Sequence, residues 1–345
     1  MEKQPFFTIG IPVYNTEKWI GECIESVLGQ NFTGFELICV DDGSKDKSLE
    51  IMCSYAEKDS KIKVISRANG GPSTARNSIL YNARGEYILF LDSDDKMNTD
   101  ILNTAFKALK DAGYPDIMEA GFINVTNGIE SVYKPVYPGN EYFSDSLTRD
   151  ERAVKLCVDK KYVPFVPAKF IKTSFLTQNG IVFNPRYMLG EDADFIFQIH
   201  RKANTIKYID ILTSLHYSPR EGSIVSNPSE KSIHTMLSFE TELYRDSKYW
   251  NLRPEFRKML WDRLLVVATE KRNYTLEILS GNVKKADVLS MTEMIEGFIG
   301  PYLKYMPKAK GTNGIIFALY RLIGMKRTVS LLYNYLKAKG VITNE

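Results

Sequence analysis

The sequence predicts an α/β fold in which a mainly parallel β-sheet is flanked by helices and followed by a helical C-terminal extension. Short apolar runs alternate with segments of helical periodicity over residues 7–91. Several of these apolar runs end in clusters of Asp, Asn, Gly and Ser, and long helical patterns replace the alternation from about residue 228 onward. Alternation of strand and helix signals is typical of βαβ units, whose strands pair in parallel.

The first hundred residues carry the clearest pattern. Strands are expected at residues 7–13, 35–40, 61–66 and 86–91, with helices between them at residues 17–28, 47–57 and 73–83. The last of these strands contains five consecutive large apolar residues, 87–91. An uninterrupted run of this kind suits a strand that is buried on both faces.

The pattern weakens after residue 96. Helices are expected at residues 99–112, 150–157 and 191–202, and strands at residues 116–123 and 206–217. Residues 133–142 are rich in Pro, Gly and Tyr and predict a loop. Pro164 and Pro167 exclude a central strand or helix over residues 162–167.

Composition is that of an ordinary soluble globular protein. The chain has 345 residues, with 45 basic and 42 acidic side chains and a formal charge of +3. Because the charges nearly balance, the protein has no strong overall electrostatic field, and no nucleic-acid partner is expected. The four cysteines lack zinc-ligand spacing and are expected to be buried free thiols. With no signal peptide or spanning segment in the pattern, a cytoplasmic protein is expected.

Polar clusters follow the strands expected in the first half of the chain, at residues 12–15, 41–44, 67–71 and 92–95. Each cluster alone is ordinary turn chemistry, because Asn, Asp, Gly and Ser dominate turns. In a parallel sheet, however, the carboxyl ends of the strands meet at one edge, where ligands bind. The four clusters together therefore predict a binding site at that edge.

The most unusual cluster is acidic. Asp92, Asp94 and Asp95 directly follow the apolar run. Like charges this close repel one another unless a cation neutralises them, and hard oxygen ligands suit a divalent metal. The alternative is an acidic turn that caps the following helix.

A second acidic pair, Glu191-Asp192, begins a predicted helix. An acidic first turn is favoured by the helix dipole, which is the structural interpretation. The functional interpretation is a carboxylate that removes a proton from an attacking group. Asp194 is the competing carboxylate, but it lies two positions further into the helix.

Taken together, the first 225 or so residues resemble the family 2 glycosyltransferases, a large inverting family of the GT-A fold that includes bacterial capsule and exopolysaccharide enzymes. The motifs occur in the family's order and spacing. They are Ile11-Pro12-Val13-Tyr14-Asn15, Val40-Asp41-Asp42-Gly43-Ser44, Asn69-Gly70-Gly71 with Ala75-Arg76-Asn77, Leu91-Asp92-Ser93-Asp94-Asp95, and Gly190-Glu191-Asp192.

The resemblance implies a role for each motif around a nucleoside-diphosphate sugar, with UDP as the expected nucleotide. Pro12 and Tyr14 would flank the uracil or ribose, and Asp42 would accept a hydrogen bond from the base imide while Asp41 supports the turn. Arg76 would lie near the diphosphate. The remaining nucleotide-binding positions implied by the motifs are Gly71, Asp92 and Ser93.

The resemblance also implies the metal and the base. Asp92 and Asp94 match the DxD motif, with Asp94 at the metal-contacting position and Mn²⁺ or Mg²⁺ as the expected ion. His216 is a further candidate ligand, since some GT-A enzymes use a late histidine. Asp192 would be the general base, and direct displacement at the anomeric carbon would invert its configuration.

Three parts are expected from these assignments: a nucleotide-sugar-binding βαβ half at residues 1–97, an acceptor-binding and catalytic half at 98–227, and a helical extension at 228–345. The expected acceptor is a growing glycan or a lipid-linked glycan. The extension is rich in Lys and Arg near the end of the chain. It would either contact the inner face of the cell membrane peripherally or pack on the domain with its lysines in water.

Two other functions share parts of this pattern. A sugar nucleotidyltransferase also places a nucleotide over a parallel sheet, but residues 12–16 lack the glycine-rich phosphate loop it would need. A nucleotide- or glycan-binding module without turnover is the non-enzymatic alternative. One position departs from the family: Ser218 stands where an arginine is usual, and Arg220 is the candidate substitute.

Overall fold

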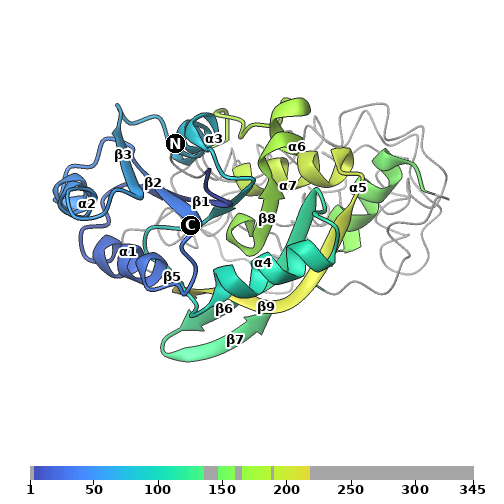
Figure 1. The fold of residues 1–345 in the computed structure, drawn as a ribbon. Helices are drawn as coiled ribbons and strands as arrows, with labels where there is room; N and C mark the ends of the chain where they lie inside the picture. The colour runs from blue at the N-terminus through green and yellow to red at the C-terminus, as the bar shows by residue number, and fades with distance from the viewer. Residues whose placement is uncertain (1–3, 136–146, 160–164, 188–189, 218–345) are drawn as a thin grey trace, which may run out of the picture. The chain divides into compact units, whose positions relative to one another are not determined.

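The structure is a computed structural model and describes residues 4–135, 147–159, 165–187 and 190–217. The expected loop after residue 217, with Ser218 and Arg220, and the expected extension at 228–345 lie outside the described residues. The described strands form one sheet in the order β3-β2-β1-β4-β8-β6-β9-β5, with β7 paired to β6 (Figure 1). This mixed α/β architecture confirms the predicted fold class.

The N-terminal half of the sheet is parallel, as the sequence predicts. Strand β1 (Phe7–Val13) lies between β2 (Phe35–Asp41) and β4 (Tyr87–Phe90), and β2 also pairs with β3 (Ile62–Ser66). All residues of β2 and β4 are buried. The expected double-sided burial of the run before the acidic cluster is therefore confirmed.

Helices cover both faces of this half. One apolar core joins the sheet to α1 (Ile20–Leu28), α2 (Ser48–Ala56) and α4 (Ile101–Asp111). A second core on the other face includes side chains of α3 (Pro72–Asn82) (Figure 1). Each of these helices begins within a few residues of its expected start.

The second half of the sheet is joined through a strand that the sequence pattern does not reveal. Strand β8 (Lys169–Lys172) pairs antiparallel with both β4 and β6 (Ile117–Thr126). Strand β6 then pairs in parallel with β9 (Ile206–Tyr217), which has the predicted bounds. Because β8 has four residues and carries a lysine at each end, it gives neither an apolar run nor an alternation.

The remaining elements are short or lie at the edge of the sheet. They are β5 (Lys96–Met97), β7 (Ile129–Tyr133), α5 (Arg149–Asp159), the 3₁₀ turn η2 (Val166–Ala168), α6 (Thr173–Gln178) and α7 (Glu191–Lys202). The sequence predicts α5 and α7 but not β5, β7 or α6. Every residue of β7 is exposed, which explains why it carries no pattern of burial.

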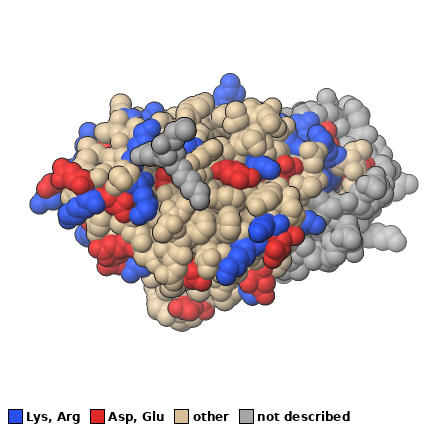
Figure 2. All heavy atoms as spheres, in the orientation of Figure 1, with Lys and Arg blue, Asp and Glu red and all other residues tan. Residues whose placement is uncertain are grey.

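Three further observations concern the charges on one face of the molecule, the thiols and the helices. Basic and acidic side chains are interspersed on the face drawn in Figure 2, as the near balance of charges predicts. Cys23 and Cys39 are buried, but Cys53 is exposed, so the expectation of buried thiols is wrong at this position. Within the described ranges, no helix combines the length and apolarity that crossing a bilayer requires.

Helix α3 lies unusually close to the central strand. A Cβ atom added at Gly10 of β1 would lie 2.4 Å from Cγ2 of Ile79, a fully buried residue of α3. Cγ2 branches directly from the Ile79 Cβ and cannot swing away as the end of a long side chain could. The absence of a side chain at position 10 thus sets how deeply α3 sits on the sheet.

We predict that Gly10→Ala destabilises the protein by about 1–3 kcal/mol, because overpacking a filled core forces side chains off their rotamers. The urea midpoint of unfolding measures this. The loss should be smaller in an Ile79→Ala background, where the clashing methyl is gone. The same substitution at Gly21 of α1, whose nearest neighbour would be 3.6 Å away, should leave stability unchanged or raise it. Equal losses at both glycines would contradict the close-approach explanation.

Candidate active site

The carboxyl ends of β1, β2, β3 and β4 meet at one edge of the sheet because these strands are parallel neighbours. Backbone hydrogen bonds tie their loops together there. The Asp42 N–H donates to the Val13 carbonyl over 2.9 Å, and the Arg67 N–H donates to the Asp41 carbonyl over 3.0 Å. The predicted polar clusters therefore share one edge.

Asp41 and Asp42 are both buried and brace this edge. Asp41 accepts hydrogen bonds from the Ser44 amide and the Ser66 hydroxyl, so it holds its own turn, as expected. Asp42 accepts the amides of Gly70 and Gly71, the latter over 2.7 Å. Burial raises the pKa of Asp42, and the two amides oppose that rise.

The other nucleotide-binding candidates differ in accessibility. Tyr14 is 46% exposed beyond the end of β1, whereas Pro12 still pairs with Val40 within the sheet. Gly71 has a positive φ of 87° and open space where a Cβ would stand. Ser93 is buried. No contact among the described residues tests whether these four candidates bind a nucleotide. Their nucleotide-binding roles therefore stay predictions.

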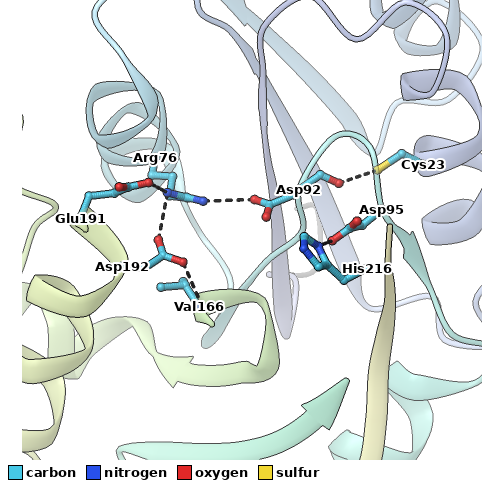
Figure 3. Close-up of polar contacts among 8 residues, drawn as sticks. All are labelled: Cys23, Arg76, Asp92, Asp95, Val166, Glu191, Asp192 and His216. Carbon is cyan, nitrogen blue, oxygen red and sulfur yellow. Dashed lines mark hydrogen bonds and ion pairs between the residues drawn. The ribbon is translucent and has the colours of Figure 1, made fainter. Parts of the chain in front are cut away.

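Arg76 stands at the centre of the site, on the second turn of α3 (Figure 3). Its Nη1 lies 2.9 Å from Oε1 of Glu191 and 3.1 Å from Oδ1 of Asp192, and its Nη2 lies 3.1 Å from Oδ1 of Asp92. One guanidinium thus joins the acidic loop after β4 to the acidic start of α7. These two motifs are about a hundred residues apart in the sequence.

Burial and charge act in opposite directions on this cluster. Burial alone would lower the pKa of Arg76, but the neighbouring carboxylates raise it, so the guanidinium stays charged. Burial and the charge of Asp192 raise the pKa of Glu191 to about 7. Burial also raises the pKa of Asp192, while Arg76 opposes that rise.

Accessibility separates the members of the cluster. The side chain of Arg76 is 6% exposed and that of Glu191 is 11% exposed, whereas Asp92 and Asp192 are each 22% exposed. The two carboxylates with predicted roles thus keep part of their side chains exposed. Glu191 and Arg76 form the interior support behind them.

The neighbour of Arg76 fixes α3 to the second half of the chain. The Asn77 side chain exchanges two 2.8 Å hydrogen bonds with the backbone N–H and carbonyl of Phe183. The hydroxyl of Ser73 donates to the carbonyl of Asn184. These contacts hold the segment that leads into α7, so Asn77 ties α3 to that segment.

The acidic loop after β4 is held from two sides. The Cys23 thiol donates to the Asp92 carbonyl over 3.5 Å, and burial raises the pKa of that thiol. On the other side, the fully buried Asp95 contacts β9: one oxygen lies 2.9 Å from Nδ1 of His216, and the other accepts the Tyr217 amide. Asp95, for which the sequence suggests only a cap or turn, connects two parts of the site.

Among the described residues, Asp92, Asp95 and His216 place candidate metal-binding atoms within 4.8 Å of one another. Two carboxylates and an imidazole suit a divalent ion. Asp94 is not a member of this group, but its charge acts on both Asp95 and His216. Burial raises the pKa of Asp95 to about 7; burial alone would lower that of His216, but the bond to Asp95 raises it to about 9.

Comparison with known proteins agrees with this geometry. A model of the family described as glycosyl transferase family 2 matches residues 8–143. The glycosyltransferase GlyG of Streptococcus pneumoniae is 31% identical over 225 residues, which cover 63% of this chain and 72% of GlyG. The uncharacterized glycosyltransferase EpsJ of Bacillus subtilis is 31% identical over 208 residues, covering 60% of this chain and 59% of EpsJ.

Among solved structures, residues 1–349 of S. aureus TarS in complex with UDP-GlcNAc match with a TM-score of 0.66 and 23% identity, covering 96% of this chain and 92% of that one. This likeness establishes the fold. The chain spans 59% of EpsJ and smaller shares of two longer relatives. The family model, the identity to GlyG over most of that protein, and the matching fold show that this chain belongs to the family 2 glycosyltransferases, with the GT-A fold.

Proposed function

We propose that this chain moves a sugar from a nucleoside-diphosphate sugar, with UDP as the nucleotide, to a hydroxyl group of a growing glycan or lipid-linked glycan. The observation that carries the proposal is the position of Arg76 between Asp92 and Asp192. It brings the loop proposed to hold the diphosphate next to the carboxylate proposed to act as base. Two bacterial relatives, a poly(ribitol-phosphate) beta-glucosyltransferase and a poly(ribitol-phosphate) beta-N-acetylglucosaminyltransferase, support a polymeric acceptor.

The divalent metal would be held by Asp92 and Asp94 together with His216. Because Asp95 already occupies Nδ1 of His216, the ring presents Nε2 to a ligand, and Asp95 serves to orient the ring. A bound divalent ion stabilises the negative charge that develops on a diphosphate leaving group. Arg76, on the other side of Asp92, adds a fixed positive charge toward the same group.

Asp192 would remove the proton from the acceptor hydroxyl. Its Oδ1 lies against Arg76 and its Oδ2 lies 3.5 Å from the Val166 amide, so the carboxylate is held at both oxygens while part of it stays exposed. A positioned carboxylate base contributes about 10²–10⁴-fold to rate. Attack from the side of Asp192, with the diphosphate leaving on the side of Asp92, inverts the anomeric centre.

The donor is testable without knowing the acceptor. Incubation with a panel of UDP-, GDP- and dTDP-sugars and Mn²⁺ should release UDP from one UDP-sugar, because water can replace the acceptor hydroxyl. The same sugar should raise the melting temperature, since a ligand at a hundred times its Kd adds about 2.7 kcal/mol of stability. Neither turnover nor stabilisation by any UDP-sugar would refute the proposed donor class.

The metal site predicts a specific effect of Asp95→Asn. This change weakens the hydrogen bond that orients His216, and loss of such an orienting partner typically costs about 10–100-fold in metal affinity. Calorimetry of UDP with and without Mn²⁺ measures it: the variant should lose the metal-dependent gain in affinity and keep metal-free binding. If chelation leaves the UDP affinity of the wild-type chain unchanged, the metal assignment fails.

The base assignment predicts that Asp192→Asn lowers kcat for UDP release by about 10²–10⁴-fold while UDP affinity is retained. Asp194→Asn is the matched control, because Asp194 lies on the same first turn of α7 but accepts a hydrogen bond from Gln198 over 2.8 Å. Its kcat should stay near that of the wild type. Equal losses in both variants, or none in Asp192→Asn, would exclude Asp192 as the base.

A further inference from the structure

A second charged cluster lies wholly inside the protein, behind the active site. Glu119 of β6 and Lys169 of β8 are both completely buried, with Nζ of Lys169 3.5 Å from Oε1 of Glu119. His200, near the end of α7, is also buried, and its Nε2 lies 2.7 Å from the same oxygen. The cluster therefore joins two adjacent strands to α7, the helix whose first turn carries Asp192.

Stability alone is a weak explanation for this cluster. Removing a lysine and a glutamate from water is costly, and replacing such buried pairs with apolar residues is often neutral or stabilising. Lys169 itself is completely buried, so a hydrocarbon side chain at this position would avoid the cost of taking a charge out of water. The lysine calls for a role that a hydrocarbon side chain could not fill.

The contacts of Lys169 lead directly to Asp192. Its Nζ donates to the carbonyl oxygen of Phe165 over 3.2 Å. That carbonyl belongs to the same planar peptide unit as the Val166 N–H, which points at Oδ2 of Asp192 over 3.5 Å (Figure 3). Lys169 thus contacts the carbonyl of this peptide group, and Asp192 contacts its N–H.

This arrangement fixes the direction of the peptide. Rotating it would remove its carbonyl from a buried ammonium group and turn the carbonyl oxygen toward a carboxylate, both of which are unfavourable. Hydrogen bonds in such a chain also polarise one another, so the ammonium group makes the Val166 N–H a better donor. The opposite oxygen of Asp192 is held by Arg76.

We propose that Lys169, anchored by Glu119, is a positioning residue that aims the Phe165–Val166 peptide at Asp192 and so fixes the orientation of the catalytic carboxylate. The inference rests on the proposed function, in which Asp192 is the base. Lys169 itself touches no substrate, since it is completely buried. Its hold on the Phe165 carbonyl acts beside the direct effect of its charge, which lowers the pKa of Asp192.

The test uses the full-length chain with the double substitution Lys169→Met and Glu119→Gln. Met keeps the length of the lysine stem without the charge, and Gln keeps a hydrogen-bonding group toward His200, so no unpaired charge is left in the interior. Lys172→Met is the matched control: it removes a lysine from the same strand, but its Nζ lies near the Tyr114 carbonyl, away from Asp192.

The double variant should bind UDP and Mn²⁺ with wild-type affinity, which also shows that it folds. Its kcat for UDP release should fall by about 10²-fold, the usual cost of a misplaced catalytic group, with KM changed little. Lys172→Met should keep the wild-type kcat. An unchanged kcat in the double variant, or a parallel loss of UDP affinity and kcat, overturns the inference.

A double-mutant cycle separates positioning from general damage. In an Asp192→Asn background, removing Lys169 and Glu119 should lower the residual kcat by less than about 3-fold, because groups that act through one another are strongly non-additive. A further full 10²-fold loss there would show that Lys169 acts independently of Asp192 and would overturn the inference.

A readout independent of turnover distinguishes this inference from the proposed function. Hydrogen exchange of the Val166 amide, followed by NMR, should be faster in the double variant and unchanged in Lys172→Met. Unchanged exchange in the double variant overturns the positioning role even if the chain is an active transferase. A wild-type chain that turns over no nucleotide sugar refutes the proposed function instead, whatever the exchange shows.

Discussion

The site depends on one constraint: a buried guanidinium must be neutralised, and the groups that neutralise Arg76 come from distant parts of the chain. Asp92 follows β4, while Glu191 and Asp192 begin α7. Moving either carboxylate segment away would remove part of the negative charge that neutralises the buried guanidinium, which is unfavourable. The ion-pair cluster therefore fixes the distance between the proposed diphosphate side and the proposed base side of the reaction centre.

Packing makes this constraint effective. Helix α3 carries Arg76 and sits close to β1 because position 10 has no side chain. The next residue, Asn77, bonds the backbone of Phe183 and so holds the segment that leads toward α7. The same helix is thus packed against the parallel half of the sheet and hydrogen-bonded to the irregular segment that precedes α7. A shift of α3 on the sheet would therefore move Arg76 and its ion pairs in the site.

Much of the fold and part of the site could be predicted from the sequence, and the reasons differ. The parallel strands and their polar ends are local signals, since each strand is an apolar run followed by turn residues. Strand β8 could not be found in this way, because it is short, follows Pro167 and begins with a lysine. Contacts between residues that are far apart in the sequence could not be predicted either. Asp95 gained a role only when β9 brought His216 beside it, 121 residues further along the chain.

The charges around Asp192 explain how one carboxylate can be both buried enough to be a useful base and ionised enough to accept a proton. Burial raises its pKa and so strengthens it as a base, while Arg76 at one oxygen and the Val166 amide at the other stabilise its ionised form. Arg76 alone would bind one oxygen and leave the carboxylate free to turn about that contact. The Val166 amide holds the second oxygen with a peptide dipole, while the charge of Lys169 lowers the pKa of Asp192. A peptide dipole backed by a buried ammonium group therefore suits this position better than a second arginine would.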